Sequence, residues 1–376
     1  MHSEEFISGI ARGGVRDVFI EGDSIGKVRN SAAEIGEKSD TLSFLFPGFI
    51  DVHNHGAAGI DVNSADAEGL LEIAKYLAKN GVTAWMPTLV PDTDEAYLRA
   101  IRAIDTLMEI QRKLPVAQAV GVHYEGVFAN EKMCGALRPE FFKRFTGTEL
   151  DELPRLKEGV HMMTLAPEVA GGLELIAELR KRGWVVSIGH TKAEKGILDA
   201  AFAAGARHFT HFFNAMTGIH HRELGVAGWA IAKADATFDI IADGIHVHPE
   251  MLKVACGFKG VDRVTLISDS IAPTGLGDGE YQIWGESIRV ENGRTLNTRG
   301  SIAGSVITML DAVMMMRRLG FSRLAIEHMA SGNPARLLSL WEKRGSIEKG
   351  KRADIVAFDE QGSLQMVMIG GKMVQL

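Results

Sequence analysis

Eight short apolar runs, spread over most of the chain, constrain its fold more than any other feature. Each run has the length of a buried strand, and most neighbouring runs are separated by enough residues for a helix. Parallel strands of one sheet need such crossover connections, and eight of them close a barrel. The runs span residues 46–55, 82–90, 116–126, 160–168, 184–191, 206–214, 237–247 and 263–271. The sequence therefore predicts an α/β protein with a (β/α)8 barrel.

Histidine and acidic side chains stand at the carboxyl ends of six of these runs. In a (β/α)8 barrel these ends face one common mouth, where catalytic residues gather. Chance placement of so many ligand-type side chains is hard to credit, so we interpret them as one site. The residues concerned are His53, His55, Glu125, His190, His211, His246 and Asp269.

This set has the composition of a metal centre. Glu125, His190 and His211 offer one carboxylate oxygen and two imidazole nitrogens, which suit Zn²⁺ or Fe²⁺ with a position left for water. His53 and His55 point to the same side of a strand and can complete a second metal position. A bound metal lowers the pKa of its water to about 7, and Asp269 is then the candidate acid/base. We expect one or two divalent ions per chain.

Both ends of the chain predict short strands outside the barrel. Residues 17–23 near the N-terminus and residues 353–358 and 366–369 near the C-terminus alternate or cluster apolar side chains between turn residues. We therefore expect one small β domain from residues 1–45 and 346–376, and a barrel domain from residues 46–345. Residues 275–300, rich in glycine, predict a hairpin excursion after the eighth strand.

Composition excludes several classes of protein. The 376 residues carry a net charge of -7, and Lys and Arg are scattered rather than gathered in a stripe, so nucleic acid is not an expected partner. No run of 18 apolar residues and no apolar signal segment is present, which predicts no membrane association. Cys134 and Cys256 are too few for a disulfide framework, and we expect reduced thiols and a cytoplasmic location.

Ten short strings, in order along the chain, resemble those of N-acetylglucosamine-6-phosphate deacetylases of the amidohydrolase superfamily. The resemblance covers the chain from about residue 45 to its end, and the ordered set is specific although each string is modest. The strings are Pro47-Gly48-Phe49-Ile50-Asp51-Val52-His53-Asn54-His55-Gly56, His123-Tyr124-Glu125-Gly126, Leu165-Ala166-Pro167-Glu168, Gly189-His190-Thr191, Thr210-His211-Phe212-Phe213-Asn214-Ala215-Met216, His220-His221-Arg222-Glu223, Asp243-Gly244-Ile245-His246, Ser268-Asp269-Ser270, Ala303-Gly304-Ser305 and Asn333-Pro334-Ala335-Arg336.

The resemblance implies a distorted (β/α)8 barrel with a small β-sandwich domain built from both termini. It implies removal of the N-acetyl group from an amino-sugar 6-phosphate, with the main metal on Glu125, His190 and His211. Asp269 would be the acid/base. Asn214, Ala215 and His246 would contact the sugar phosphate. Arg222 would reach the phosphate of the neighbouring subunit, which points to a homodimer.

Two positions depart from the family pattern. The usual Glu-Gly-Pro is Glu125-Gly126-Val127 here, which alters the loop that carries this segment. Where many members carry a histidine that polarises the acetyl carbonyl, this chain has Leu137 after Gly135-Ala136. Leucine cannot donate a hydrogen bond, and the loss of one such donor costs on the order of 3 kcal/mol in the barrier. Another group substitutes, the preferred substrate differs, or activity is low.

Three alternatives follow from the residues and the resemblance. A cyclic-amide hydrolase of the superfamily is disfavoured because run four ends at Glu168 and contains no lysine. Deacetylation of the galactosamine isomer stays open, since one inverted hydroxyl is read by contacts that a sequence does not show. A sugar-phosphate binding protein with weak or lost activity would explain Leu137, whereas Glu125 and Asp269 favour an enzyme.

Overall fold

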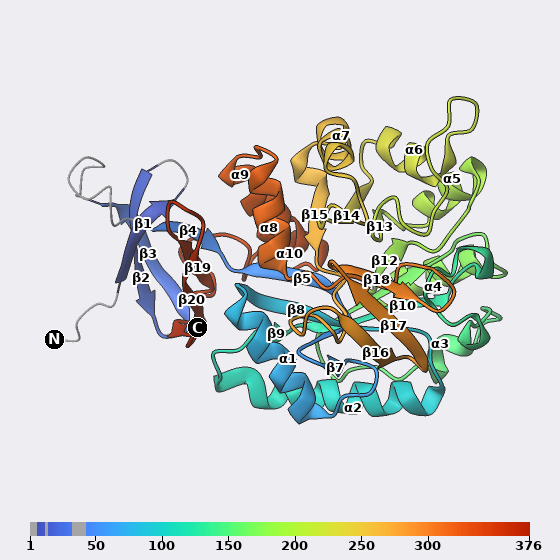
Figure 1. The fold of residues 1–376 in the computed structure, drawn as a ribbon, viewed down its shortest axis with the longest axis horizontal. Helices are drawn as coiled ribbons and strands as arrows, with labels where there is room; N and C mark the ends of the chain where they lie inside the picture. Colours follow the sequence, from blue (N-terminus) through green and yellow to red (C-terminus); the bar gives the residue numbers. More distant parts are fainter. Residues whose placement is uncertain (1–5, 12–13, 32–42) are drawn as a thin grey trace.

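A computed structural model of the chain describes residues 6–11, 14–31 and 43–376. It contains a barrel of parallel strands and a separate sheet built from both ends of the chain (Figure 1). Residues 1–5, where the sequence predicts no signal segment, lie outside the described residues. Among the described helices, none has the length and apolar character needed to cross a membrane.

The barrel consists of eight parallel strands in sequence order, as the eight apolar runs predict. Neighbouring strands pair in parallel around the sheet, and the bridge between Asn54 and Ser270 joins its two edges. The strands are β5 (Phe49–Asn54), β8 (Val82–Leu89), β10 (Gly121–Phe128), β11 (Val160–Leu165), β12 (Val185–Ile188), β13 (His208–Phe209), β14 (Thr237–Ile241) and β15 (Val264–Ile267), and β9 (Gln118–Ala119) pairs beside β8.

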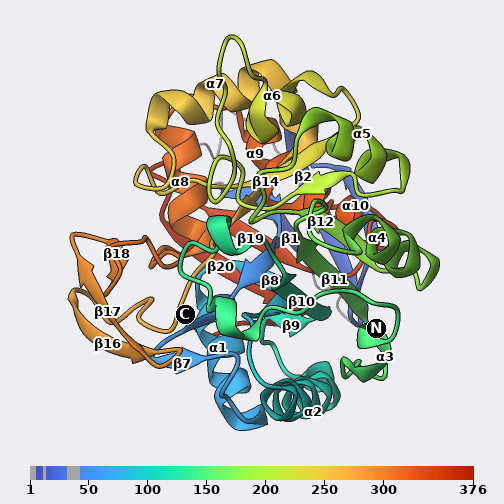
Figure 2. The ribbon, with the colours of Figure 1, turned by 90° about the vertical axis from the view of Figure 1, so that its right-hand side faces the viewer.

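Helices cover the outside of this barrel (Figures 1 and 2). Their apolar faces bury residues such as Leu70, Ile104 and Leu252 against the strands. Polar caps define several starts; for example, Asp66 accepts a hydrogen bond from the backbone of Gly69. The helices are α1 (Ala67–Lys79), α2 (Asp94–Ile110), α3 (Glu149–Glu152), α4 (Gly172–Lys181), α5 (Lys195–Ala203), α6 (Gly225–Ala232), α7 (Pro249–Lys259), α8 (Met309–Arg318), α9 (Arg323–Glu327) and α10 (Asn333–Leu337).

Apolar side chains fill the amino-terminal end of the barrel interior. Ile50, Met86, Met162 and Ile241 point inward and pack in one cluster with Leu338, the residue after α10. This end of the barrel is therefore a packed core. The opposite, carboxyl-terminal end remains for a site.

The second sheet joins both ends of the chain, as predicted. Its strand order is β21-β20-β19-β4-β1-β2-β3, and β4 pairs directly with β19. Side chains from both halves of the sheet, among them Val18 and Ile355, pack in one cluster. The strands are β1 (Phe6–Ala11), β2 (Gly14–Glu21), β3 (Ser24–Asn30), β4 (Phe44–Pro47), β19 (Ile355–Phe358), β20 (Leu364–Ile369) and β21 (Lys372–Met373). The residue boundaries of the two domains stay a prediction.

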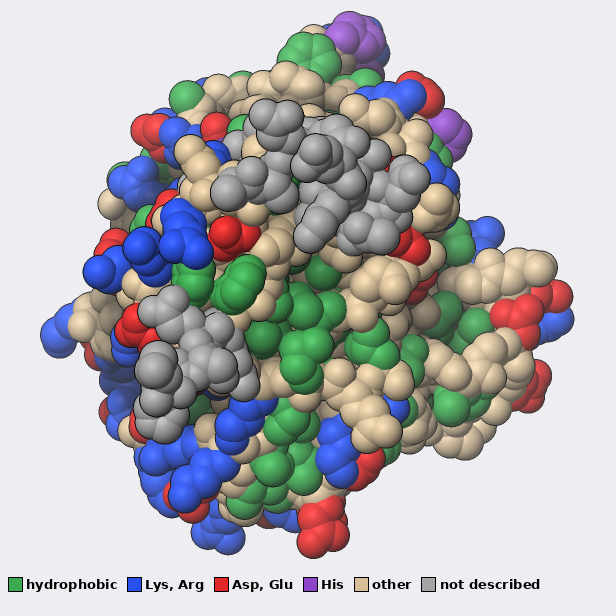
Figure 3. All heavy atoms as spheres, turned by 90° about the vertical axis from the view of Figure 1, so that its left-hand side faces the viewer, with side chains coloured by type: hydrophobic (Ala, Val, Ile, Leu, Met, Phe, Trp, Pro, Cys, Tyr) green, Lys and Arg blue, Asp and Glu red, His purple; other side chains and the backbone are tan. Residues whose placement is uncertain are grey.

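The side of the molecule that carries this sheet shows a band of hydrophobic side chains between charged ones (Figure 3). Basic and acidic side chains share this face.

The glycine-rich stretch after β15 forms a three-stranded antiparallel sheet at the barrel mouth (Figure 2). Its strands are β16 (Gly279–Ile283), β17 (Glu286–Glu291) and β18 (Arg294–Asn297), while β6 (Gly56–Ala57) and β7 (Ile60–Asp61) form a small hairpin after β5. We refer to β16–β18 as the mouth sheet.

Candidate metal centre and active site

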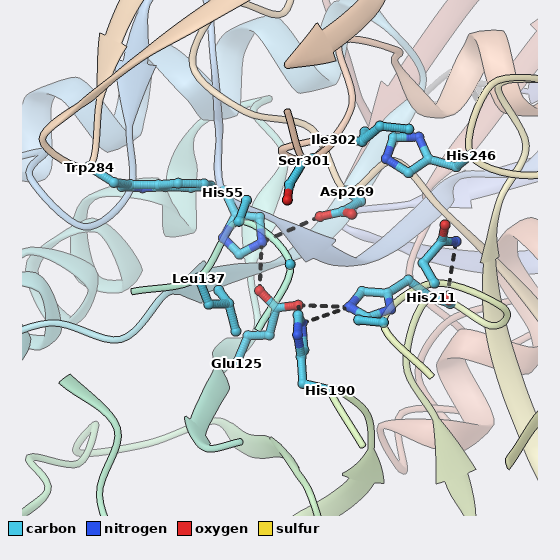
Figure 4. A pocket seen from close by; sticks show the side chains of 15 residues that line it. His55, Glu125, Leu137, His190, His211, His246, Asp269, Trp284, Ser301 and Ile302 are labelled. Carbon is cyan, nitrogen blue, oxygen red and sulfur yellow. Dashed lines mark hydrogen bonds and ion pairs between the residues drawn. The ribbon is translucent and has the colours of Figure 1, made fainter. Parts of the chain in front are cut away.

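A cavity of 310 Å³ opens at the carboxyl-terminal end of the barrel (Figure 4). Most of the residues singled out in the sequence line it, and His53 lies fully buried beside His55. The lining residues are His55, Glu125, Gly135, Ala136, Leu137, His190, His211, Asn214, Ala215, His246, Asp269, Trp284, Ser301, Ile302 and Gly304.

Glu125, His190 and His211 bring their ligand atoms to one point, and we call these three residues the Glu125 group. Glu125 Oε1 lies 3.1 Å from His190 Nε2 and 3.0 Å from His211 Nε2, and the two nitrogens are 3.1 Å apart. Donors placed tetrahedrally about 2.1 Å from one ion are about 3.4 Å apart. The spacing of the three atoms therefore suits a small divalent ion at their centre.

The protonation of His190 supports this fit. Its Nδ1 lies 2.9 Å from the carbonyl oxygen of Met133, which can only accept, so Nδ1 carries the hydrogen. In the neutral ring Nε2 then carries no hydrogen, and its lone pair faces the carboxylate of Glu125. Two electron-rich atoms at this distance repel each other unless a positive charge lies between them. A metal ion would supply that charge.

His53, His55 and Asp269 form a second set of converging ligand atoms, which we call the His53 group. The Nε2 atoms of His53 and His55 are 3.0 Å apart, and each lies 3.4 Å from Asp269 Oδ1. Glu125 Oε2 lies 3.1 Å from His55 Nε2, so the Glu125 carboxylate stands between the two groups. The arrangement has room for two neighbouring ions.

Electrostatics at this point favour positive charge. Burial disfavours charged histidines, but the carboxylates of Asp269 and Glu125 outweigh it and raise the pKa of His55 to about 10. Burial also opposes the charge of His211, whose pKa Glu125 raises to about 9. Burial raises the pKa of Glu125, yet the surrounding histidines hold it well below its usual range. The two carboxylates are therefore stabilised by nearby positive charge, either protons on the histidines or metal ions.

Three of the candidate metal-ligand and acid/base residues adopt backbone conformations that side chains rarely take. His190, His211 and Asp269 have φ values of 47°, 32° and 49°. Each stands two residues beyond the end of its strand, after β12, β13 and β15. Left-handed conformations of bulky residues cost free energy and cluster at functional sites. The strained turns aim the three side chains at the cavity rather than along the strand.

Asn214 and His246 both line the cavity, and His246 lies on the side opposite Leu137 and Trp284 (Figure 4). The Asn214 amide donates to the carbonyl oxygen of His211 at 3.2 Å. His246 Nδ1 lies 2.6 Å from Asp243 Oδ2, which fixes the ring and leaves Nε2 as its second polar atom. His246 stands five residues beyond β14, so a turn rather than the predicted strand end positions it.

Arg222 does not line the cavity of its own chain. It lies in an exposed loop between β13 and α6, where Ile219 and Leu224 expose 54% and 42% of their surface. The loop projects from the molecule beside α6 and α7 (Figure 2). Met251, Val254 and Phe258 of α7 are exposed as well.

Trp284 is a lining residue that the sequence reasoning missed. It stands at the tip of the mouth sheet, within the stretch predicted as a hairpin excursion, and its signal in the sequence was the dipeptide Trp284-Gly285 at the centre of a hairpin. Leu137, noted for its lack of a donor, does line the cavity, and 4% of it is exposed.

The chain matches the amidohydrolase family over residues 44–374. It is 36% identical over 331 residues to the N-acetylgalactosamine-6-phosphate deacetylase of Escherichia coli O157:H7, covering 88% of this chain and 87% of the relative. It is also 36% identical over 318 residues to the N-acetylglucosamine-6-phosphate deacetylase of Bacillus subtilis (strain 168), covering 84% and 80%.

Solved structures agree with these matches. The N-acetylglucosamine-6-phosphate deacetylase of Thermotoga maritima superposes with a TM-score of 0.88 at 29% identity, covering 99% of both chains. A variant of the enzyme from Mycobacterium smegmatis, in complex with N-acetyl-D-glucosamine-6-phosphate, superposes with a TM-score of 0.87 at 28% identity over 100% of both chains.

Proposed function

The chain belongs to the amidohydrolase family, among the deacetylases of N-acetylhexosamine 6-phosphates, and from this we propose the reaction that it catalyses. It hydrolyses the N-acetyl group of an N-acetylhexosamine 6-phosphate, in the first place N-acetylglucosamine 6-phosphate, to the amino-sugar 6-phosphate and acetate. The observation that carries the proposal is the convergence of Glu125, His190, His211 and Asp269 in one cavity.

The family is metal-dependent, and the Glu125 group would hold the main ion, zinc or iron. When bound, the ion supplies Lewis acidity at the acetyl carbonyl. The Asp269 carboxylate takes the proton of the attacking water and returns it to the nitrogen of the departing amine. The His53 group would hold a second ion, in which case Glu125 lies between the two sites.

We assign the sugar phosphate to the lining residues Asn214, Ala215 and His246. An amide and an imidazole there offer donors to hydroxyl and phosphate oxygens. The two isomers remain separate candidates, because relatives with 36% identity include a galactosamine and a glucosamine enzyme.

Arg222 would complete the phosphate site of a second subunit. A guanidinium binds phosphate through paired hydrogen bonds, yet Arg222 is exposed and outside the cavity of its own chain. The apolar side chains exposed beside it, on its loop and on α7, favour burial against another copy. We therefore propose a homodimer. The cytoplasmic location stays a prediction.

The test is acetate release from both N-acetylhexosamine 6-phosphates by the metal-loaded protein, alongside Asp269→Asn. We expect release from at least one isomer and a loss of several orders of magnitude in the variant. Release from neither isomer, with binding intact, would favour the sugar-phosphate binding protein that Leu137 suggests. Equal rates for wild type and variant would remove Asp269 from its role.

A further inference from the structure

The cavity has two chemically different ends, with the Glu125 group and Asp269 between them (Figure 4). His246 lies at one end, next to Ile302, and Asn214 also lines the cavity; we call the His246 side the polar end. On the opposite side of the centre lie Leu137 and Trp284, which we call the acyl wall. A substrate whose sugar occupies the polar end and whose amide carbonyl lies at the centre must direct its acyl chain toward the acyl wall.

Trp284 is held in a defined position. It occupies the first position of the turn between β16 and β17 with a φ of 54°, which is strained for a bulky residue. Its indole Nε1 donates to Asp61 Oδ2 at 2.8 Å, across to the hairpin that follows β5. Its ring meets that of His55 edge to face, with 5.5 Å between centroids. A single imidazole ring therefore separates Trp284 from the Glu125 carboxylate.

Leu137 is held by the loop that precedes it and by the mouth sheet. Its backbone N–H donates to the carbonyl of Cys134 at 2.9 Å. Arg299 donates to the carbonyls of Ala136 and Leu137 at 3.1 and 3.3 Å, and also to Glu286 of β17 at 3.0 Å. Ala136 and Trp284 pack on the same apolar cluster beneath the mouth sheet. Arg299 and this apolar cluster thus connect the loop that carries Leu137 with the sheet that carries Trp284.

We propose that Leu137 and Trp284 select the acyl group that the enzyme removes, and limit it to acetyl. The inference rests on the proposed function and names the part of the substrate that these residues contact. A histidine in place of Leu137 would offer a donor to the carbonyl oxygen, whereas leucine offers an apolar surface to the acyl carbons. Selection by shape then replaces selection by a hydrogen bond.

The test compares N-acetyl, N-propionyl and N-butyryl glucosamine 6-phosphate as substrates of wild type, Trp284→Ala and Leu137→Ala. Wild type should prefer acetyl over propionyl by about 10- to 200-fold in kcat/KM, the range for one methylene in an apolar pocket. In each variant, the ratio of kcat/KM for the acetyl substrate to that for the propionyl substrate should fall about tenfold or more. Arg289→Ala is the matched control, because this side chain lies on the mouth sheet but is 61% exposed and outside the cavity.

A binding measurement separates this inference from the proposed function. In the Asp269→Asn background, calorimetry gives the Kd of the acetyl and butyryl sugar phosphates without turnover, with and without Trp284→Ala. If Trp284→Ala brings the Kd of the butyryl compound closer to that of the acetyl compound, the acyl wall is supported even if no acyl group is released. An unchanged ratio, together with an unchanged kcat/KM preference, overturns it, while acetate release by wild type would still uphold the deacetylase.

Discussion

The Asp51 carboxylate accepts a hydrogen bond from the Ser268 hydroxyl at 2.6 Å and thereby joins the first and last strands of the barrel. Asp51 also accepts from the amide of Asn54 at 3.2 Å and from the backbone N–H of Ser268. His53 lies two residues after Asp51, and Asp269 follows Ser268 directly. The seam of the barrel and the His53 group therefore share one set of hydrogen bonds.

Replacement of Asp51 should weaken the fold and the second metal position together. Asp51→Ala leaves the buried Ser268 hydroxyl and Asn54 amide with fewer acceptors, and we expect the free energy of unfolding to fall by about 3 kcal/mol. Asp51→Asn keeps one acceptor oxygen and should cost about half as much. Urea unfolding measures both. Equal stability of wild type and Asp51→Ala would show that the seam does not depend on this carboxylate.

Metal content should separate the two groups of ligands. We expect a metal-to-chain ratio near two in wild type and near one in the double variant His53→Ala/His55→Ala, because the Glu125 group remains complete. In Glu125→Ala the metal-to-chain ratio should fall below one, since Glu125 lies between the two groups. His328→Ala, which changes a histidine far from either group, is the control. A ratio near one in wild type would leave His53 and His55 as cavity lining.

Arg222→Ala should raise KM for the phosphorylated sugar about tenfold or more, the effect of one lost charge-assisted hydrogen bond of about 1.5–3 kcal/mol. Folding and kcat should change little, because the side chain is exposed in its own subunit.

Mixed dimers test whether Arg222 acts across subunits. Asp269→Asn lacks its own acid/base but supplies Arg222, whereas Arg222→Ala retains Asp269 and needs a neighbour's arginine. Co-refolded mixtures should therefore contain sites with the wild-type KM. If the mixture shows only the raised KM of Arg222→Ala, Arg222 does not reach the neighbouring site.

Gly126→Ala should disturb the Glu125 group from the adjacent position. Gly126 has a φ of 73°, and a Cβ there would lie 2.3 Å from Leu137 Cδ1. Two costs add, backbone strain and steric overlap, and only the second depends on Leu137. Gly126→Ala/Leu137→Ala should therefore regain part of the metal affinity that Gly126→Ala loses. A double variant no better than Gly126→Ala would assign the whole effect to the backbone.

The two cysteines should differ in reactivity. Burial raises the pKa of the Cys256 thiol to about 12, whereas Cys134 is partly exposed in the loop before Leu137. Since the thiolate is the reactive form, a thiol reagent at pH 8 should label one site per native chain and none in Cys134→Ser.

Cys256 should also make the fold less stable above pH 9. There the unfolded thiol ionises and the folded one does not, so wild type should lose stability relative to Cys256→Ala as pH rises.

The barrel could be predicted from the sequence because its strands are buried on both faces and therefore read as apolar runs. The candidate ligand residues were predicted from their place at the ends of those runs. The run at residues 46–55 proved to be two strands. β4 pairs with β19, β5 lies in the barrel, and Gly48 stands between them where a Cβ would lie 2.2 Å from Thr83. Apolar periodicity carries no sign of such a close approach.

The role of Trp284 could not be predicted for a different reason. Its indole is fixed by Asp61, which is 223 residues away in the chain. A turn signal gives the position of a hairpin but not the direction in which its tip points. The same limit applies to Leu137, whose place in the cavity depends on Arg299.

The pairing of β4 with β19 makes the entire barrel an insertion between two neighbouring strands of one sheet. During synthesis, a chain that already contains all eight barrel strands still leaves one edge of β4 open, because β19 to β21 follow the barrel in the chain. An open strand edge is a template for unwanted pairing with other chains. The segment from β19 to β21 therefore completes the sheet by covering the open edge of β4. A chain released before this segment is made would keep an unpaired strand edge that can pair with other chains.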